Sequence, residues 1–231
     1  GSLSSKLPVL DTLSQQNVLA TITRQRLGKY LRASGQDVQK ALRLYVLNTK
    51  VSASVFVDLH YIEVALRNQF DRELAAKSGP EWFKDAGFLS LLNGRGQDIL
   101  KKAQRDAKKN WVHGPVPPGK VIAELTFGFW LQLTDSRLEH TLWVPCLHKA
   151  FLPRKAPKRS TFNQQLEKLR QLRNRVAHHE PIFQMDLNDA QRIMGDVCNI
   201  LCPSTARLMQ GTSTVRRDVM GLAKYCKQKG L

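Results

Sequence analysis

The sequence predicts an all-α fold, a bundle of helices rather than a sheet. Apolar residues recur at alternating steps of three and four over several long stretches, which places them on one face of a helix. Alternation with a period of two, the sign of a half-buried strand, is scarce. Groups of Gly and Pro separate the helical stretches, as at residues 78–80 and 114–119. A chain of 231 residues is long enough to bury one sizeable core.

The first part of the chain predicts three helices. Thr23 can cap one helix and Asp37 a second, because Thr and Asp side chains accept the unpaired N–H groups of a first turn. Residues 51–74 predict a third, long helix, which ends before the Ser-Gly-Pro group at 78–80. The apolar stripe of this long helix consists of Val55, Leu59, Ile62, Leu66 and Phe70.

The rest of the chain predicts further helices separated by loops. Residues 76–95 are expected to be irregular, with Trp82 and Phe83 anchoring the segment to the core. The predicted helices are residues 96–109, 120–133, 136–150 with a kink at Pro145, 160–178, a segment from Asp186 or Asn188 to Pro203, and 214–228. We expect a helical domain over residues 3–203 and a basic helix or tail over 204–231. Gly1 and Ser2 resemble an expression-tag scar.

The chain is strongly basic, with 36 Lys and Arg against 19 Asp and Glu and a formal net charge of +17. This excess favours a polyanionic partner such as RNA, and a merely solvated basic surface is the alternative. The charges are clustered. The clusters that we expect to contact RNA are Lys101, Lys102 and Arg105 in the helix at 96–109, and Arg154, Lys155, Lys158 and Arg159 just before the helix at 160–178.

The cysteines and apolar segments do not indicate export or a membrane span. Cys146, Cys198, Cys202 and Cys226 are too few and too scattered for a disulfide scaffold. Cys198 and Cys202 lie one helical turn apart without a second ligand pair, which favours core cysteines over zinc. The most apolar stretch, residues 121–133, is too short to cross a bilayer, and no signal sequence opens the chain. We expect a cytoplasmic protein without a metal ion or cofactor.

The segment 173–181, Arg-Asn-Arg-Val-Ala-His-His-Glu-Pro, carries the clearest indication of chemistry. Arg173 brings a permanent cation, which can neutralise charge that develops on a phosphate. His178 and His179 bring imidazoles, which can move protons near neutral pH. These groups are sufficient for cutting RNA without a metal, because the nucleophile, the 2′-hydroxyl, belongs to the substrate.

The spacing within this segment does not place Arg and His on one helical face. Arg173 and His178 are five residues apart, or about 140° around a helix. Asn174 and His178 are i, i+4 neighbours, so Asn174 can fix the tautomer of His178. Two arrangements can still bring Arg173 and His178 together. The helix can end near His179, because Glu180 precedes a proline and resists helical backbone angles. Alternatively, the long Arg173 side chain can curl round the helix axis. Arg175 is expected to contact an RNA phosphate or to remain solvated.

Several segments resemble one known family. The Arg-x4-His spacing at 173–178 resembles the R-x4–6-H signature of HEPN ribonucleases. Residues 59–68 resemble the "LExxLRN" helix of the Abi-like (abortive infection) branch of these proteins, and residues 122–130 resemble its "xELxFGxW" helix. Residues 26–31, followed by residues 41–45, give a third resemblance to the same family. The chain is therefore identified, by resemblance, as an Abi-like member of the HEPN superfamily.

This resemblance implies a metal-independent endoribonuclease toxin of an abortive-infection or toxin–antitoxin system, restrained by an antitoxin RNA or protein. Cleavage by transesterification would leave a 2′,3′-cyclic phosphate. The resemblance also implies a C2 homodimer with a composite site, and a helix whose Glu63 and Arg67 orient Arg173 or simply form a salt bridge. His179 also fits the spacing, so which imidazole acts stays open.

Two other functional classes remain. One is a catalytically inactive RNA-binding regulator of the same fold. The other is a DNA-binding regulator, which the charge permits but no helix-turn-helix pattern supports.

Overall fold

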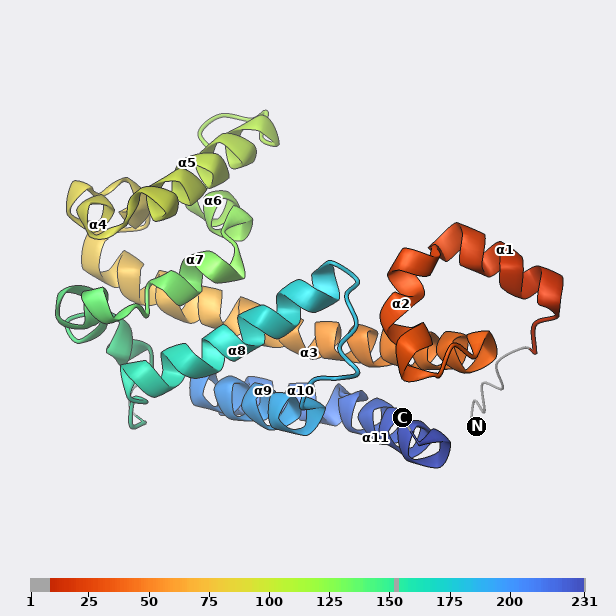
Figure 1. Ribbon diagram of the computed structural model, residues 1–231. Coiled ribbons are helices and arrows are strands. Elements are labelled where there is room, and N and C mark those ends of the chain that lie inside the picture. Colours follow the sequence, from red (N-terminus) through yellow and green to blue (C-terminus); the bar gives the residue numbers. More distant parts are fainter. Residues whose placement is uncertain (1–8, 152–153, 231) are drawn as a thin grey trace. The chain divides into compact units, whose positions relative to one another are not determined.

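The computed structural model describes residues 9–151 and 154–230, and the regular structure within these ranges is entirely helical (Figure 1). This confirms the prediction of an all-α fold. The chain forms two compact units. The first unit combines the residues up to Val57 with Arg173–Gln191 and the residues from Ser213 onwards. The second unit combines Asp58–Leu172 with Arg192–Thr212. No helix of the described residues has both the length and the apolar character that crossing a membrane requires.

The first unit contains both predicted N-terminal caps and one helix that the sequence did not predict. Helix α1 (Thr12–Ile22) begins where the Asp11 side chain accepts from the backbone N–H of Ser14. Helix α2 (Arg24–Ala33) is capped by Thr23, as predicted. The core of this unit is formed by Leu27, Tyr30, Ala41, Leu44, Ile182 and Val219.

Helix α3 (Val38–Ser78) is one continuous helix of 41 residues, although the sequence predicted two. Asp37 caps its first turn, as predicted, by accepting from the backbone N–H of Lys40. The break expected between residues 45 and 51 is absent from the described structure because no Gly or Pro lies there to interrupt the helix. Asn48, a weak helix former, is instead buried and accepts hydrogen bonds from another segment. Residues of α3 up to Val57 belong to the first unit and later ones to the second.

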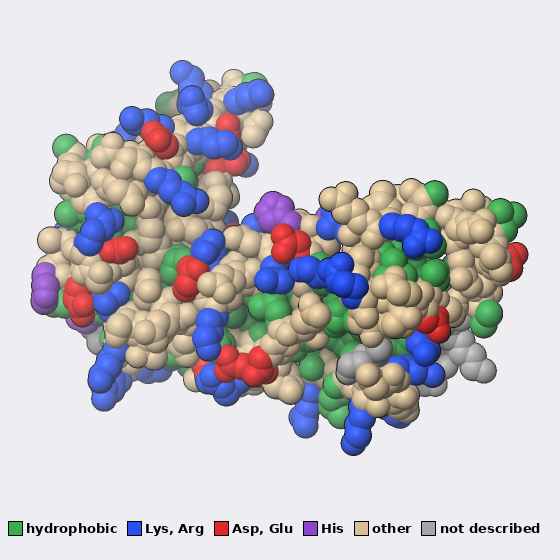
Figure 2. Space-filling view, viewed as in Figure 1, with side chains coloured by type: hydrophobic (Ala, Val, Ile, Leu, Met, Phe, Trp, Pro, Cys, Tyr) green, Lys and Arg blue, Asp and Glu red, His purple; other side chains and the backbone are tan. Residues whose placement is uncertain are grey.

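The second unit gathers its aromatic core from short helices. Trp82 and Phe83 are buried, which confirms their predicted anchoring role. The segment around them is not irregular, because it forms η1 (Trp82–Lys84) and α4 (Ala86–Leu91). The basic helix α5 (Gly94–Lys109) starts two residues before its predicted position. Figure 2 shows Lys and Arg side chains gathered over it.

The helix predicted at 120–133 is two helices, α6 (Pro118–Glu124) and α7 (Phe127–Gln132). Leu125 has extended backbone angles, and the Thr126 side chain then caps α7 by accepting from the N–H of Phe129. A capping residue inside an apolar stretch therefore divides the helix. The division leaves Phe127, Phe129 and Trp130 buried.

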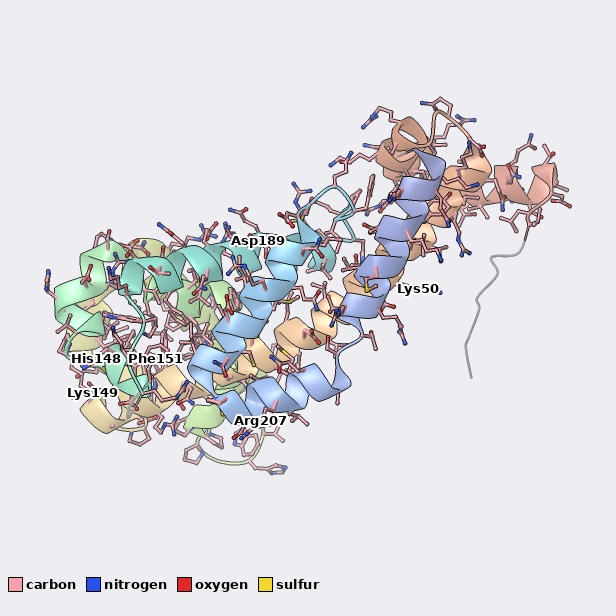
Figure 3. The ribbon with its side chains drawn as sticks, turned by 90° about the horizontal axis from the view of Figure 1, so that it is seen from below. Lys50, His148, Lys149, Phe151, Asp189 and Arg207 are labelled. Atoms are coloured by element: carbon pink, nitrogen blue, oxygen red, sulfur yellow. The ribbon has the colours of Figure 1, made fainter. Side chains whose placement is uncertain are left out.

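Residues 136–150 do not form the predicted α-helix. They form short helices of other kinds, namely the 3₁₀-helical η2 (Ser136–Leu138) and η4 (Leu147–Phe151) and the π-helical η3 (Glu139–Trp143). Pro145 lacks a backbone N–H and cannot continue a helix from η3. These short helices instead bring Phe151, labelled in Figure 3, to 5.3 Å from the ring of Phe162.

The C-terminal helices follow the prediction more closely. Helix α8 (Arg159–Ala177) matches the predicted motif helix, and α9 (Leu187–Leu201) begins after Asp186, whose side chain caps it. Pro203 ends α9 but also opens α10 (Pro203–Thr212), because the first position of a helix tolerates proline. Helix α11 (Val215–Lys229) confirms the last predicted helix. Figure 3 labels Asp189 in the first turn of α9 and Arg207 on α10.

Candidate functional site at the end of α8

The Arg–His motif lies at the C-terminal end of α8, within the first unit. Val176 is buried and fixes the last turn of the helix to the core. Arg173, Asn174 and Arg175 are half-buried, and Arg173 takes part in an interaction within the structure. The side chains of His178 and His179 are exposed, so both imidazoles are open to solvent.

The chain leaves α8 through a Schellman turn in which His179 occupies the left-handed position. His179 has φ 56°, a conformation that glycine usually supplies at this place. The backbone N–H of Glu180 donates to the carbonyl of Arg175 at 2.7 Å, and that of His179 donates to Val176 at 3.0 Å. These two bonds define the Schellman turn. The predicted helix end near His179 is therefore confirmed, with Pro181 following the turn.

Arg26, near the start of α2, closes the same helix end. Its Nη1 donates to the backbone carbonyls of His178 at 3.3 Å and His179 at 3.1 Å. A guanidinium is favourable here because partial negative charge collects on the last carbonyls of a helix. The backbones of both histidines are thus held by Arg26 while their side chains stay exposed.

The segment that follows the turn is fixed to the first unit by α3 and α2. The buried Asn48 side chain on α3 accepts from the backbone N–H groups of Ile182 at 2.8 Å and Phe183 at 3.0 Å. The ring of Phe183 lies 5.2 Å from that of Tyr30 on α2, and Ile182 is fully buried. Removing one partner from a buried hydrogen bond leaves a polar group unsatisfied, so these contacts hold the turn firmly.

Within the motif, helical spacing persists as far as His178. Its backbone N–H donates to the carbonyl of Asn174 at 3.0 Å, so Asn174 lies one turn before His178, as predicted. His179 leaves the helical path and loses the i, i+4 relation to Arg175. The Nη1 of Arg175 instead donates to the carbonyl of Pro181 at 3.4 Å.

Two arginines of the predicted RNA-binding loop serve the fold of the second unit. Arg159 donates to the Glu139 carboxylate at 2.9 Å and to the Thr134 carbonyl at 2.7 Å, and only 9% of its side chain is exposed. Arg154 donates to the carbonyls of Asn199, Ile200 and Leu201 at the end of α9. Lys155 and Lys158 are exposed.

The basic residues of α5 lie on the surface of the second unit. Lys101, Lys102 and Arg105 are all exposed, and Lys102 pairs with Asp106 at 2.5 Å. The pKa of Asp106 is lowered by its hydrogen bond with Lys102. Lys101 also lines an open pocket of about 300 Å³ together with Phe83, Lys84, Leu89, Gln97, Leu100 and Gln104. This surface keeps its predicted basic character.

Glu63 and Arg67 lie on the part of α3 that belongs to the second unit, and both are half-buried. The Nε of Arg67 donates to the side-chain oxygen of Asn68 at 3.3 Å, and Glu63 has an interaction of its own. The role of this pair in orienting Arg173 stays a prediction.

Residues that the sequence did not single out complete the site. Arg26, Asn48 and Lys29 were not predicted as site residues. Arg26 and Asn48 are hydrogen-bonded to a segment more than 130 positions away in the chain, and local patterns do not reveal such contacts. Arg26 and Lys29 line an open cleft of about 450 Å³ with Thr23, Gln25, Glu180 and Pro181. The cleft therefore adjoins the turn that displays the two histidines.

The comparisons with known proteins give one match, to a family model. Within residues 9–151 and 154–230, no three His, Cys, Asp or Glu side chains are grouped to hold a metal ion. No curated protein and no solved structure gives a significant match. The family model described as Abi-like protein matches residues 15–184, a range that contains all of α2, all of α8 and the whole Arg–His motif. The chain therefore belongs to the family of Abi-like proteins.

Proposed function

We propose that this Abi-like protein is a metal-independent endoribonuclease toxin whose active site is the end of α8. Membership of the family suggests a function in abortive infection. The observation that supports ribonuclease chemistry is the turn itself. The turn carries two exposed imidazoles, and Arg26 holds its backbone. Asn48 holds the segment that follows it. The half-buried Arg173 lies five residues before His178. Rigid support of exposed titratable groups is what acid–base catalysis requires.

The proposed reaction is transesterification of the RNA backbone. One imidazole removes the proton of the 2′-hydroxyl, and the 2′-oxygen forms a bond to phosphorus. The bond from phosphorus to the 5′-oxygen breaks, and the departing oxygen takes a proton from a second acid. Arg173 stabilises the extra negative charge on the pentacoordinate phosphorus. The products are a 2′,3′-cyclic phosphate and a 5′-hydroxyl.

A homodimer is part of this proposal. Transesterification needs a base for the 2′-hydroxyl and an acid for the departing 5′-oxygen. Each chain carries one Arg–His motif, so a partner copy can supply the second group. Two motif turns that face each other across a C2 axis would form such a composite site. Lys155, Lys158 and the basic surface of α5 would attract the RNA, because phosphates favour a positively charged surface.

The test is cleavage of a defined RNA by purified protein in EDTA, with mapping of the new ends. We expect cyclic phosphates with wild type and strongly reduced cleavage with His178→Ala at equal concentration. Cleavage that stops in EDTA and returns with Mg²⁺ would contradict the proposal.

The net charge of +17 also supports a second candidate, an inactive RNA-binding regulator. That candidate predicts RNA binding by the wild-type protein without any new RNA ends. The same preparation distinguishes the two, since binding is measured before cleavage is assayed.

A further inference from the structure

The cleft beside the histidine turn has the size and openness of a binding site for part of a polymer. It measures about 450 Å³ and is bounded by the start of α2 on one side and by Glu180 and Pro181 on the other. Volumes of a few hundred Å³ are typical of ligand sites. Thr23, Gln25, Arg26 and Lys29 are all exposed, so a strand can lie in the cleft without entering a closed cavity.

The cleft is fixed relative to the proposed catalytic groups. Glu180, which lines it, follows His179 directly in the chain. Arg26, which also lines it, is hydrogen-bonded to the backbone of both histidines. All of these residues belong to the first unit. A group bound in the cleft is therefore held at a constant position next to the imidazoles.

The charge of the cleft favours an anion. Helix α2 has the sequence RQRLGKYLRA, with four cations and no acidic residue. Like charges spaced three or four residues apart on a helix slightly destabilise it, so this composition is unfavourable unless an anion offsets it. The cleft includes Arg26 and Lys29 against the single acid Glu180. The N-terminus of a helix of this length adds further positive potential.

Arg26 can hold the turn and contact an anion at the same time. Both of its bonds to the histidine carbonyls are made by Nη1. A guanidinium carries five N–H donors in a fixed fork, so the donors on Nε and Nη2 lie outside these bonds. Lys29 follows Arg26 by three residues, on the same side of the helix. Gln25 adds a neutral amide that can bond to a ribose or base.

We propose that this cleft binds a phosphate of single-stranded RNA that flanks the phosphate being cleaved, with Arg26 and Lys29 as its cations. The inference rests on the proposed function and extends it by naming a substrate subsite. An extended strand places successive phosphates within reach of neighbouring groups on one surface. Binding of the flanking phosphate aligns the scissile one with His178 or His179.

The test separates binding from cleavage. Binding of a fluorescent single-stranded RNA is measured in the His178→Ala background over a range of salt concentrations. Adding Lys29→Glu is expected to weaken binding at least about tenfold, because a like charge replaces a contact. It should lower the slope of log affinity against log salt concentration by about 1, the change expected when one phosphate contact is lost. Lys29→Arg should retain both the affinity and the salt slope of the His178→Ala protein. In the active protein, Lys29→Glu should raise KM more than it lowers kcat.

The matched control is Lys224→Glu. Lys224 is an exposed lysine on α11 in the same unit, and it does not line the cleft. The Lys224→Glu substitution should change the RNA affinity and the salt slope little. Equal losses in the two variants, or unchanged affinity with Lys29→Glu, would overturn the subsite. The melting temperature of each variant is measured, so that a loss of RNA binding caused by unfolding can be recognised.

The failure of this inference differs from the failure of the proposed function. If wild type cleaves RNA and Lys29→Glu leaves KM unchanged, the subsite is wrong and the ribonuclease assignment stands. If no RNA is cleaved but Lys29→Glu still weakens binding specifically, the assignment as an enzyme is wrong and the cleft stands as an RNA-binding site.

Discussion

Two helices of this protein end against an arginine from elsewhere in the chain, and the two ends differ in what surrounds them. In the second unit, Arg154 donates to three carbonyls at the end of α9, at 2.8 to 3.2 Å. In the first unit, Arg26 donates to two carbonyls at the end of α8, at 3.1 and 3.3 Å. The chemistry is the same in both places, a cation on the negative end of a helix.

The surroundings of the two ends differ. After α9 the chain turns directly into α10, and Leu201 is buried at the junction. After α8 the chain displays two exposed histidines beside an open, basic cleft. Under the proposed function, an arginine that supports the site and one that only stabilises the fold make the same kind of bond. Exposed titratable groups next to open volume make the difference.

The largest expected effect is on the rate of RNA cleavage, through substitutions at the end of α8. His178→Ala should lower the rate of RNA cleavage by about 10² to 10⁴-fold, the usual contribution of a general acid or base. Arg173→Ala should do the same through loss of charge stabilisation. The control is His140→Ala, which removes an exposed histidine from the second unit and should leave the rate unchanged. An active His178→Ala together with an inactive His179→Ala would show that the longer Arg–His spacing is used.

The second prediction compares the two arginines directly. Arg154→Ala should destabilise the fold by about 1–3 kcal/mol, because three carbonyls lose a charged donor. It should leave cleavage by the folded protein unchanged. Arg26→Ala should lose less stability and reduce cleavage several-fold, because the histidine turn is no longer held. Urea unfolding and the cleavage rate are measured on both variants, and a loss of stability without any loss of rate in Arg26→Ala would contradict the comparison.

The third prediction concerns the left-handed residue. His179→Gly should stabilise the fold by up to about 1 kcal/mol, because glycine adopts φ 56° without a steric penalty. Glycine at the neighbouring position is the control. His178→Gly should destabilise, since it adds flexibility where no positive φ is needed. Thermal unfolding measures both changes. A lower melting temperature for His179→Gly would mean that the histidine side chain itself stabilises the turn.

The smallest expected effect is a difference in reactivity between two cysteines at the end of α9. The hydrogen bonds that Thr205 donates at the start of α10 lower the pKa of the Cys202 thiol. Burial raises the pKa of Cys198, one turn earlier, to about 11. Because the thiolate is the nucleophile, iodoacetamide at pH 8 should label Cys202 well before Cys198, and Cys202 should stay reactive to lower pH. Peptide mass spectrometry after timed labelling measures the order. Faster labelling of Cys198 would show that this helix end opens readily.

The sequence predicted the parts of the fold and site that depend on local signals. Thr23, Asp37 and Asp186 cap helices as predicted, and α8 ends in the expected turn. The continuity of α3 was not predicted, because the polar residue Asn48 is held by backbone groups 134 and 135 positions away. Arg26 and the cleft were missed for the same reason. Contacts between distant segments leave no periodicity in the sequence.

The unit that carries the Arg–His motif is assembled from three separate stretches of chain, and the last of them contains α11. Helix α11 is joined to the start of α3 by the Tyr225 hydroxyl, which donates to the carbonyl of Lys40 at 3.2 Å. During translation the motif is synthesised well before α11, and the unit that supports it can fold completely only after α11 has left the ribosome. A chain that ends between residues 180 and 215 would therefore lack a finished site, so under the proposed function such truncated chains would be inactive.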